Sequence, residues 1–164
     1  VLVELLNALR LSRIALHART GKQQYKGHPD LEAFQGFYEL CQHPLYYNGG
    51  IESLSDIRQI LIRFPLLKGV FIGRGLLSSP LLAKEFKGNE TFLPEQRMSI
   101  YFAFHEELFS AYSQVLQGET QLLVKMKTLW EYFLPETDRK LLKRIKKSTR
   151  LQQYTESVKA IFTS

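Results

Sequence analysis

The sequence has 164 residues, of which 45% are hydrophobic, and this is enough apolar material for one or two small packed units. No run of about 18 apolar residues occurs, so neither a membrane-spanning helix nor a membrane partner is expected. The single cysteine, Cys41, excludes an internal disulfide and fits a reducing cytoplasm. The sequence begins at Val1 inside an apolar-periodic stretch without a start signal, which favours a fragment of a longer chain.

The net charge of +6 is concentrated near the C-terminal end. Residues 1–120 carry equal numbers of basic and acidic side chains, whereas residues 121–164 carry ten basic and four acidic ones. Concentrated positive charge attracts polyanions. A solvated helix face gives the same pattern, so the charge alone leaves both interpretations open.

The first part of the sequence alternates helical and strand patterns. Apolar spacing and capping signals predict helices over 1–11, 30–42, 53–64 and 79–86, and strands over 13–19, 44–48 and 69–72. A capping box from Ser53 to Asp56 supports the third helix. Strands separated by helices pair in parallel through right-handed crossovers, so the predicted class is α/β, either an open sheet or a barrel.

The second part of the sequence has only helical patterns. Helices are predicted over 94–117, 120–134, 137–147 and 149–162, the third capped by Thr137 and the fourth by a box from Thr149 to Gln152. Short connections between helices indicate a small antiparallel bundle. The predicted domains are therefore 1–88 and 91–164.

The three predicted strands all end in residues that suit an anion. These residues are His17 to Arg19, Asn48-Gly49-Gly50 and Gly73-Arg74-Gly75. Ligands of parallel α/β folds bind at the carboxyl ends of strands. Glycine lets the backbone approach a ligand and present N–H donors, and arginine adds a full charge. Ordinary turn chemistry explains one glycine pair, but two pairs at consecutive strand ends favour a phosphate site.

His17 alternates along its strand with Ala15 and Arg19, while the apolar residues between them face the other way. The apolar set suits packing against helices, so His17 and Arg19 are expected to point into a barrel mouth. A lone strand histidine is usually structural, but a nearby arginine at the same strand end favours function.

Three segments resemble the motifs of tRNA-dihydrouridine synthases in order and spacing. They are ALHARTGKQQYKG (15–27), PLYYNGGI (44–51) and GVFIGRGLLSSPLL (69–82), and the tail segments KMKTLWEYF (125–133) and KRIKKSTRLQQY (143–154) resemble the family more weakly. The resemblance implies the second half of a (β/α)8 TIM barrel, with about three parallel strands, followed by an all-helical tRNA-binding domain. In many family members Asp or Glu stands where this sequence has Gly50.

The family enzymes reduce the C5–C6 double bond of uridine in tRNA with FMN as the hydride carrier, NADPH as reductant and a cysteine as general acid. By resemblance, six residues contact FMN: His17, Asn48, Gly49, Gly50, Gly73 and Arg74. Arg19 is implied to face the flavin or the RNA. The family's acid cysteine maps upstream of Val1, and Cys41 is interpreted as a small buried hydrophobe. No catalytic residue and no metal ligand is therefore expected in this chain.

The basic stretch near the end is predicted to contact tRNA. At 100° per residue most of its cations share one helix face, which suits a phosphate backbone. The expected tRNA contacts are Lys143, Arg144, Lys146, Lys147 and Arg150. Trp130, Tyr132 and Phe133 could stack on bases, although core packing is the favoured interpretation.

Two other functional classes remain open. One is a barrel oxidoreductase that binds FMN or another phosphate and acts on a small molecule, which would not need the basic tail. The other is a non-catalytic RNA-binding module with a vestigial half-barrel. The isolated chain is expected to be inactive, because the acid is missing, and to self-associate through open sheet edges.

Overall fold

The computed structural model describes residues 2–23 and 27–163. By their contacts these residues form two compact units, Val1–Leu76 and Leu77–Ser164. The division lies upstream of the segment 88–91 in which the sequence predicts the domain boundary, and it assigns the helix before that segment to the second unit.

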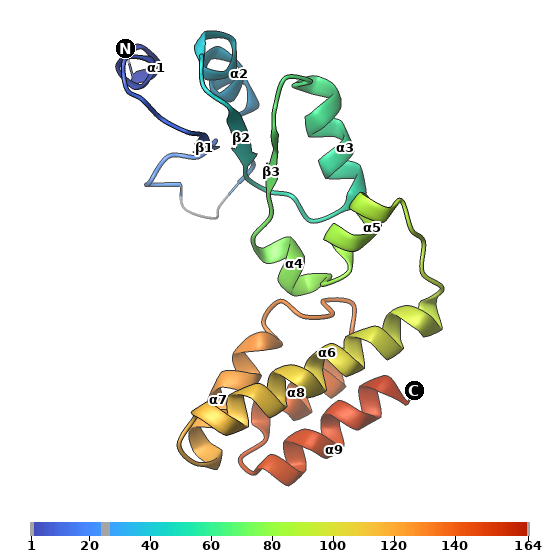
Figure 1. The fold of residues 1–164 in the computed structure, drawn as a ribbon. Helices are drawn as coiled ribbons and strands as arrows, with labels where there is room; N and C mark the ends of the chain where they lie inside the picture. The colour runs from blue at the N-terminus through green and yellow to red at the C-terminus, as the bar shows by residue number, and fades with distance from the viewer. Residues whose placement is uncertain (1, 24–26, 164) are drawn as a thin grey trace. The chain divides into compact units, whose positions relative to one another are not determined.

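The first unit alternates helices and strands (Figure 1). Its elements are α1 (Leu2–Asn7), β1 (Ile14–His17), α2 (Leu31–Leu40), β2 (Leu45–Asn48), α3 (Leu54–Arg63) and β3 (Gly69–Phe71). The strands form a parallel sheet in the order β1-β2-β3. The prediction of an α/β fold with parallel pairing is therefore confirmed.

The capping box of α3 is also confirmed. The Ser53 hydroxyl accepts from the Asp56 amide at 3.1 Å, and the Asp56 carboxylate accepts from the Ser53 amide at 2.8 Å. The reciprocal bonds satisfy two amides at the helix start. They fix the point at which the chain leaves β2 and turns into α3.

The two faces of the sheet are buried to different extents. One face carries Tyr47, which is 1% exposed and meets the Phe34 ring edge-on at a centroid distance of 4.9 Å. The other face carries the row formed by His17, Asn48 and Phe71, and the Phe71 side chain is 44% exposed. Because parallel sheets normally bury both faces, the second face is the unusual one.

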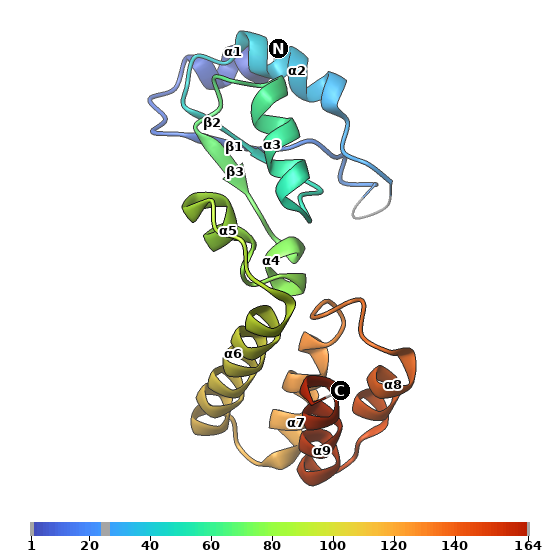
Figure 2. The same cartoon turned by 90° about the vertical axis from the view of Figure 1, so that its right-hand side faces the viewer.

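The second unit contains helices joined by loops and turns, with no strand in residues 77–163. It contains α5 (Leu82–Gly88), α6 (Pro94–Val115), α7 (Glu119–Leu129), α8 (Arg139–Lys147) and α9 (Leu151–Phe162), while α4 (Arg74–Ser78) spans the division between the units. Helices α6, α7 and α9 lie side by side (Figure 2). The core of this unit includes Met126, Phe133, Ile145 and Tyr154, whose side chains are all fully buried.

Several predicted helix ends need correction. The helix predicted over 79–86 begins later, as α5, and the short helix α4 before it was not predicted; Pro80 lacks the amide that would continue α4. Asp138 caps α8 in place of Thr137, since its carboxylate accepts from the amides of residues 140 and 141. The box from Thr149 to Gln152 is wrong, because the Thr149 amide donates instead to Gln153 Oε1 at 3.0 Å.

The predicted helix over 120–134 also ends early, at Leu129. Three turns follow it, in which the amides of Trp130, Tyr132 and Phe133 donate to carbonyls of residues 127 and 129. These turns bury the Trp130 and Phe133 side chains, leaving Tyr132 38% exposed. Core packing therefore accounts for two of the three aromatics near residue 130. Within the described residues, no helix combines the length and the apolar character that crossing a membrane requires.

Candidate phosphate site and basic groove

A pocket of about 270 Å³ lies at the carboxyl ends of the three strands. It is lined by eight of the residues that the sequence singles out at these ends: His17, Arg19, Asn48, Gly49, Gly50, Gly73, Arg74 and Gly75. Parallel pairing brings these residues together, because it places the ends of β1, β2 and β3 at one edge of the sheet. Three further lining residues did not stand out in the sequence: Ile51, Glu52 and Phe71.

Backbone geometry explains the glycines at the end of β2. Gly50 has φ of 57°, in the left-handed region that favours glycine. A Cβ at Gly49 would lie 3.2 Å from both the Pro29 ring and the Tyr47 hydroxyl. Pro29 and Tyr47 therefore pack against one side of the turn, and Gly49 and Gly50 line the pocket.

The glycines after β3 have two different roles. A Cβ at Gly75 would overlap the Ile51 carbonyl oxygen and lie 3.1 Å from the Glu52 Cα, so two backbones pack directly against each other there. A Cβ at Gly73 would meet nothing within 4 Å. Because Gly73 lines the pocket, any side chain at that position would occupy pocket space.

Arg19 connects the pocket to the loop that follows β1. Its Nη2 donates to the Gly27 carbonyl at 2.9 Å and lies 3.9 Å from the Cβ position of Gly50. Its Nε is buried without an acceptor among the described residues. A buried donor without a partner costs about 1–3 kcal/mol, and an anion in the pocket is one kind of group that offsets such a cost. Residues 24–26 of the first family motif lie outside the described residues.

The charges around the pocket are mainly positive. Arg19 and Arg74 line it with one acid, Glu52. Burial raises the pKa of the nearby Tyr47 hydroxyl, an effect that Arg19 partly opposes and Asp56 reinforces. Tyr47 therefore stays a neutral phenol behind the Gly49 turn and adds no negative charge to the site.

Cys41 lies away from this pocket. It is the C-cap of α2, it is half-buried, and its Sγ donates to the His43 carbonyl at 3.6 Å. It is not among the residues that line the pocket, and it is less buried than the interpretation as a small buried hydrophobe expects.

A groove between α8 and α9 collects part of the basic stretch. It has a volume of about 420 Å³ and is lined by four cations of α8: Lys140, Lys143, Arg144 and Lys147. From the α9 side it is lined by residues that include Gln153 and Glu156. Lys140 was missed as a site residue because the angular pattern alone does not show on which side α9 packs.

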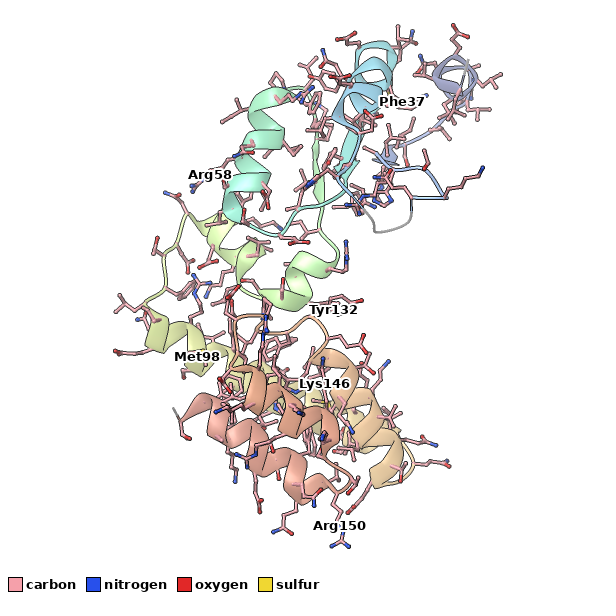
Figure 3. The ribbon with its side chains drawn as sticks, turned by 180° about the vertical axis from the view of Figure 1, so that it is seen from behind. Phe37, Arg58, Met98, Tyr132, Lys146 and Arg150 are labelled. Carbon is pink, nitrogen blue, oxygen red and sulfur yellow. The ribbon has the colours of Figure 1, made fainter. Side chains whose placement is uncertain are left out.

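Two cations of the predicted contact set lie outside this groove. Lys146 is exposed on α8 but is not among the lining residues. Arg150 is the N-cap of α9 and does not continue the α8 face, because α8 ends at Lys147. The Arg150 side chain projects outward near the start of α9 (Figure 3).

A parallel α/β sheet with glycines and arginines around a pocket at its strand ends is an arrangement typical of α/β proteins that bind phosphate groups. Comparison with family models narrows this class. The model described as Dihydrouridine synthase (Dus) matches residues 2–163, and the chain belongs to this family. As a family these proteins are oxidoreductases that are generally flavin-dependent.

Two curated relatives carry the same description, "Probable tRNA-dihydrouridine synthase". The one from Aquifex aeolicus (strain VF5) is 34% identical over 86 residues, which is 52% of this chain and 27% of the relative. The one from Rhizobium leguminosarum bv. phaseoli is 36% identical over 67 residues, 41% of this chain and 21% of the relative. The matched segments thus span only about a quarter of each relative's length.

Proposed function

We propose that this chain forms the phosphate-binding and RNA-binding parts of a tRNA-dihydrouridine synthase. In this proposal, residues 1–88 belong to the second half of a (β/α)8 barrel and residues 91–164 form the tRNA-binding helical domain. The whole enzyme reduces the C5–C6 double bond of uridine in tRNA with FMN and NAD(P)H, in the cytoplasm. The convergence of three strand ends on one pocket carries the proposal.

The residues at this pocket fit FMN. Gly73 leaves space that any side chain would fill, and Arg19 lines the pocket with its Nε buried without an acceptor among the described residues. We assign the FMN phosphate to Gly49, Gly50, Gly73 and Arg74, and the flavin to the neighbourhood of His17 and Asn48. When bound, FMN supplies hydride chemistry; the protein binds its phosphate, orients it and holds positive charge beside it.

The proton required by this reduction is assigned to residues outside the present sequence. Cys41 is separated from the pocket, and the half-barrel interpretation leaves the family's acid cysteine on an earlier strand. We therefore expect the 164-residue chain by itself to show no dihydrouridine synthase activity.

The α8–α9 groove supports RNA as the partner. Its four cations line one concave surface, whereas a solvated face needs no such convergence. We assign tRNA phosphates to Lys143, Arg144 and Lys147, together with Lys140, and place Lys146 and Arg150 at the margin. Arg19 remains assigned to the flavin or the RNA at the mouth of the barrel.

Flavin titration of the intact protein tests the enzyme assignment. We expect FMN to bind, and Arg74→Gln to weaken its binding by about 10-fold or more, because the substitution removes a charge-assisted hydrogen bond to the phosphate. Arg58→Gln, an arginine outside the pocket lining, is the matched control and should leave FMN affinity unchanged. Failure of the wild-type protein to retain FMN at saturating concentration would leave only the non-catalytic RNA-binding class.

A salt series of tRNA binding tests the partner. Removing one cation that binds a phosphate reduces the slope of log K against log salt by about one. We expect this reduction for Lys143→Glu and for Arg144→Glu, but not for Lys159→Glu, which makes the same charge change outside the groove. A flat salt response of the wild-type protein would favour the small-molecule oxidoreductase instead.

A further inference from the structure

Phe71 is an aromatic residue in the candidate FMN pocket to which no role has yet been assigned. It is the last residue of β3, two positions before Gly73, and it lines the pocket with His17 and Asn48. The strand register places these three residues in one row across the sheet. The Phe71 side chain is 44% exposed, although it is a large apolar group that lines a pocket together with charged and polar residues.

The neighbouring row supports the Phe71 ring in its position. Tyr46 packs edge-on against Phe71, with ring centroids 5.6 Å apart and an interplanar angle of 77°. Gly69 makes room for this arrangement, because a Cβ there would lie 3.3 Å from the Tyr46 ring. Tyr46 and Phe71 thus form a continuous aromatic surface, which we call the aromatic shelf, on the open face of the sheet.

The pocket therefore has two chemically different ends. Glycines and Arg74 form a polar end that suits a phosphate, and Phe71 supplies an apolar edge next to it. A ligand that consisted of phosphate alone would leave the Phe71 ring in water. A ligand that joins a phosphate to a planar aromatic group satisfies both ends, because aromatic rings pair favourably by stacking or edge contact.

We propose that Phe71 is a ligand-binding residue whose ring packs against the flavin ring system, while Gly73 and Arg74 hold the phosphate. Tyr46 positions Phe71 and needs no contact with the ligand itself. This inference rests on the proposed flavin function and adds to it a residue that recognises the ring and not the phosphate.

The test compares FMN with riboflavin, which has the same ring but no phosphate, in the intact protein. Flavin fluorescence titrations give the dissociation constant of each ligand for the wild type, Phe71→Leu, Phe71→Trp and Arg74→Gln. We expect Phe71→Leu to weaken both ligands by about 3- to 10-fold, because leucine keeps the apolar contact but not its aromatic component. Phe71→Trp should bind both ligands within about 2-fold of the wild type. Arg74→Gln should weaken FMN far more than riboflavin.

A matched control separates ligand binding from folding. Leu66→Ala truncates another exposed apolar side chain of the same unit, 76% exposed and outside the pocket lining, and should leave both dissociation constants unchanged. Unchanged flavin affinities in Phe71→Leu, with a lower melting temperature of the flavin-free protein, would overturn the inference and make Phe71 a barrel-core residue. If the wild type binds neither flavin, the proposed function itself fails, and that result is distinct from the first.

Discussion

A buried hydrogen-bond network in the helical unit makes a strong stability prediction. The Tyr154 hydroxyl accepts from Trp130 Nε1 at 2.9 Å and lies 2.6 Å from His105 Nε2. A tyrosine hydroxyl can both donate and accept, so the direction of the bond to His105 depends on which imidazole nitrogen is protonated; the Glu106 carboxylate can only accept. The imidazole then carries its proton on Nδ1, which lies 3.1 Å from the Glu106 carboxylate. Burial lowers the pKa of His105, so the ring is neutral and its Nε2 accepts from the Tyr154 hydroxyl.

The substitution Tyr154→Phe removes only the hydroxyl. It leaves the Trp130 N–H and His105 Nε2 without partners in a core where Tyr154 is 0% and His105 1% exposed. Each orphaned buried group costs about 1–3 kcal/mol, so the two together should lower the free energy of unfolding by at least about 2 kcal/mol. Against a typical domain stability of about 5–15 kcal/mol this is a large fraction.

Urea unfolding followed by tryptophan fluorescence measures this loss directly. Trp130 is the only tryptophan of the sequence and belongs to the network, so its emission reports on the core in question. With a slope of about 1–3 kcal/mol per molar urea, the midpoint should fall by about 1–2 M.

Tyr132→Phe is the matched control for this experiment. It deletes the same hydroxyl from a side chain that is 38% exposed, so we expect a change within about 0.5 kcal/mol. A loss below about 0.5 kcal/mol for Tyr154→Phe, similar to the control, would refute the argument that the network must be satisfied to stabilise this core.

Three other features of the molecule carry further predictions. Burial lowers the pKa of His105 in the folded protein, an effect that Glu106 only partly offsets. In the unfolded chain a histidine binds a proton below about pH 6.5. The contribution of His105 to the free energy of unfolding is therefore fully present above that pH and decreases below it by at most about 1.4 kcal/mol per pH unit. His105→Gln should remove this part of the pH dependence in urea unfolding, and equal slopes in the two proteins would contradict it. Gly75→Ala should destabilise the protein by about 1–3 kcal/mol, because the added Cβ overlaps the Ile51 carbonyl oxygen. Gly36→Ala lies within α2, where an added Cβ meets open space, and should stabilise the protein by about 0.5–1 kcal/mol. Thermal melts of the two variants should therefore shift in opposite directions. The 164-residue chain should self-associate, because β1 and β3 each have one edge unpaired among the described residues, and a stable monomer in light scattering would exclude this.

Signals within short stretches of the sequence are sufficient for the local structure and for much of the candidate site. Apolar spacing and capping residues are such signals, so the strands, most helices and the α3 capping box follow from them. The strand-end residues from His17 to Arg74 could also be grouped in advance. Parallel strands bring their carboxyl ends to one edge of a sheet whatever the details of packing.

Features that depend on contacts between distant segments could be seen only in the folded chain. The groove includes Lys140 and excludes Lys146, because α9 packs on one side of α8 and a helical wheel does not contain that choice. Phe71 has an ordinary strand pattern in the sequence, and it becomes a pocket residue only when the register aligns it with His17 and Asn48. Periodicity tells how a segment can bury its apolar side, but the neighbour that covers this side is selected by the fold as a whole.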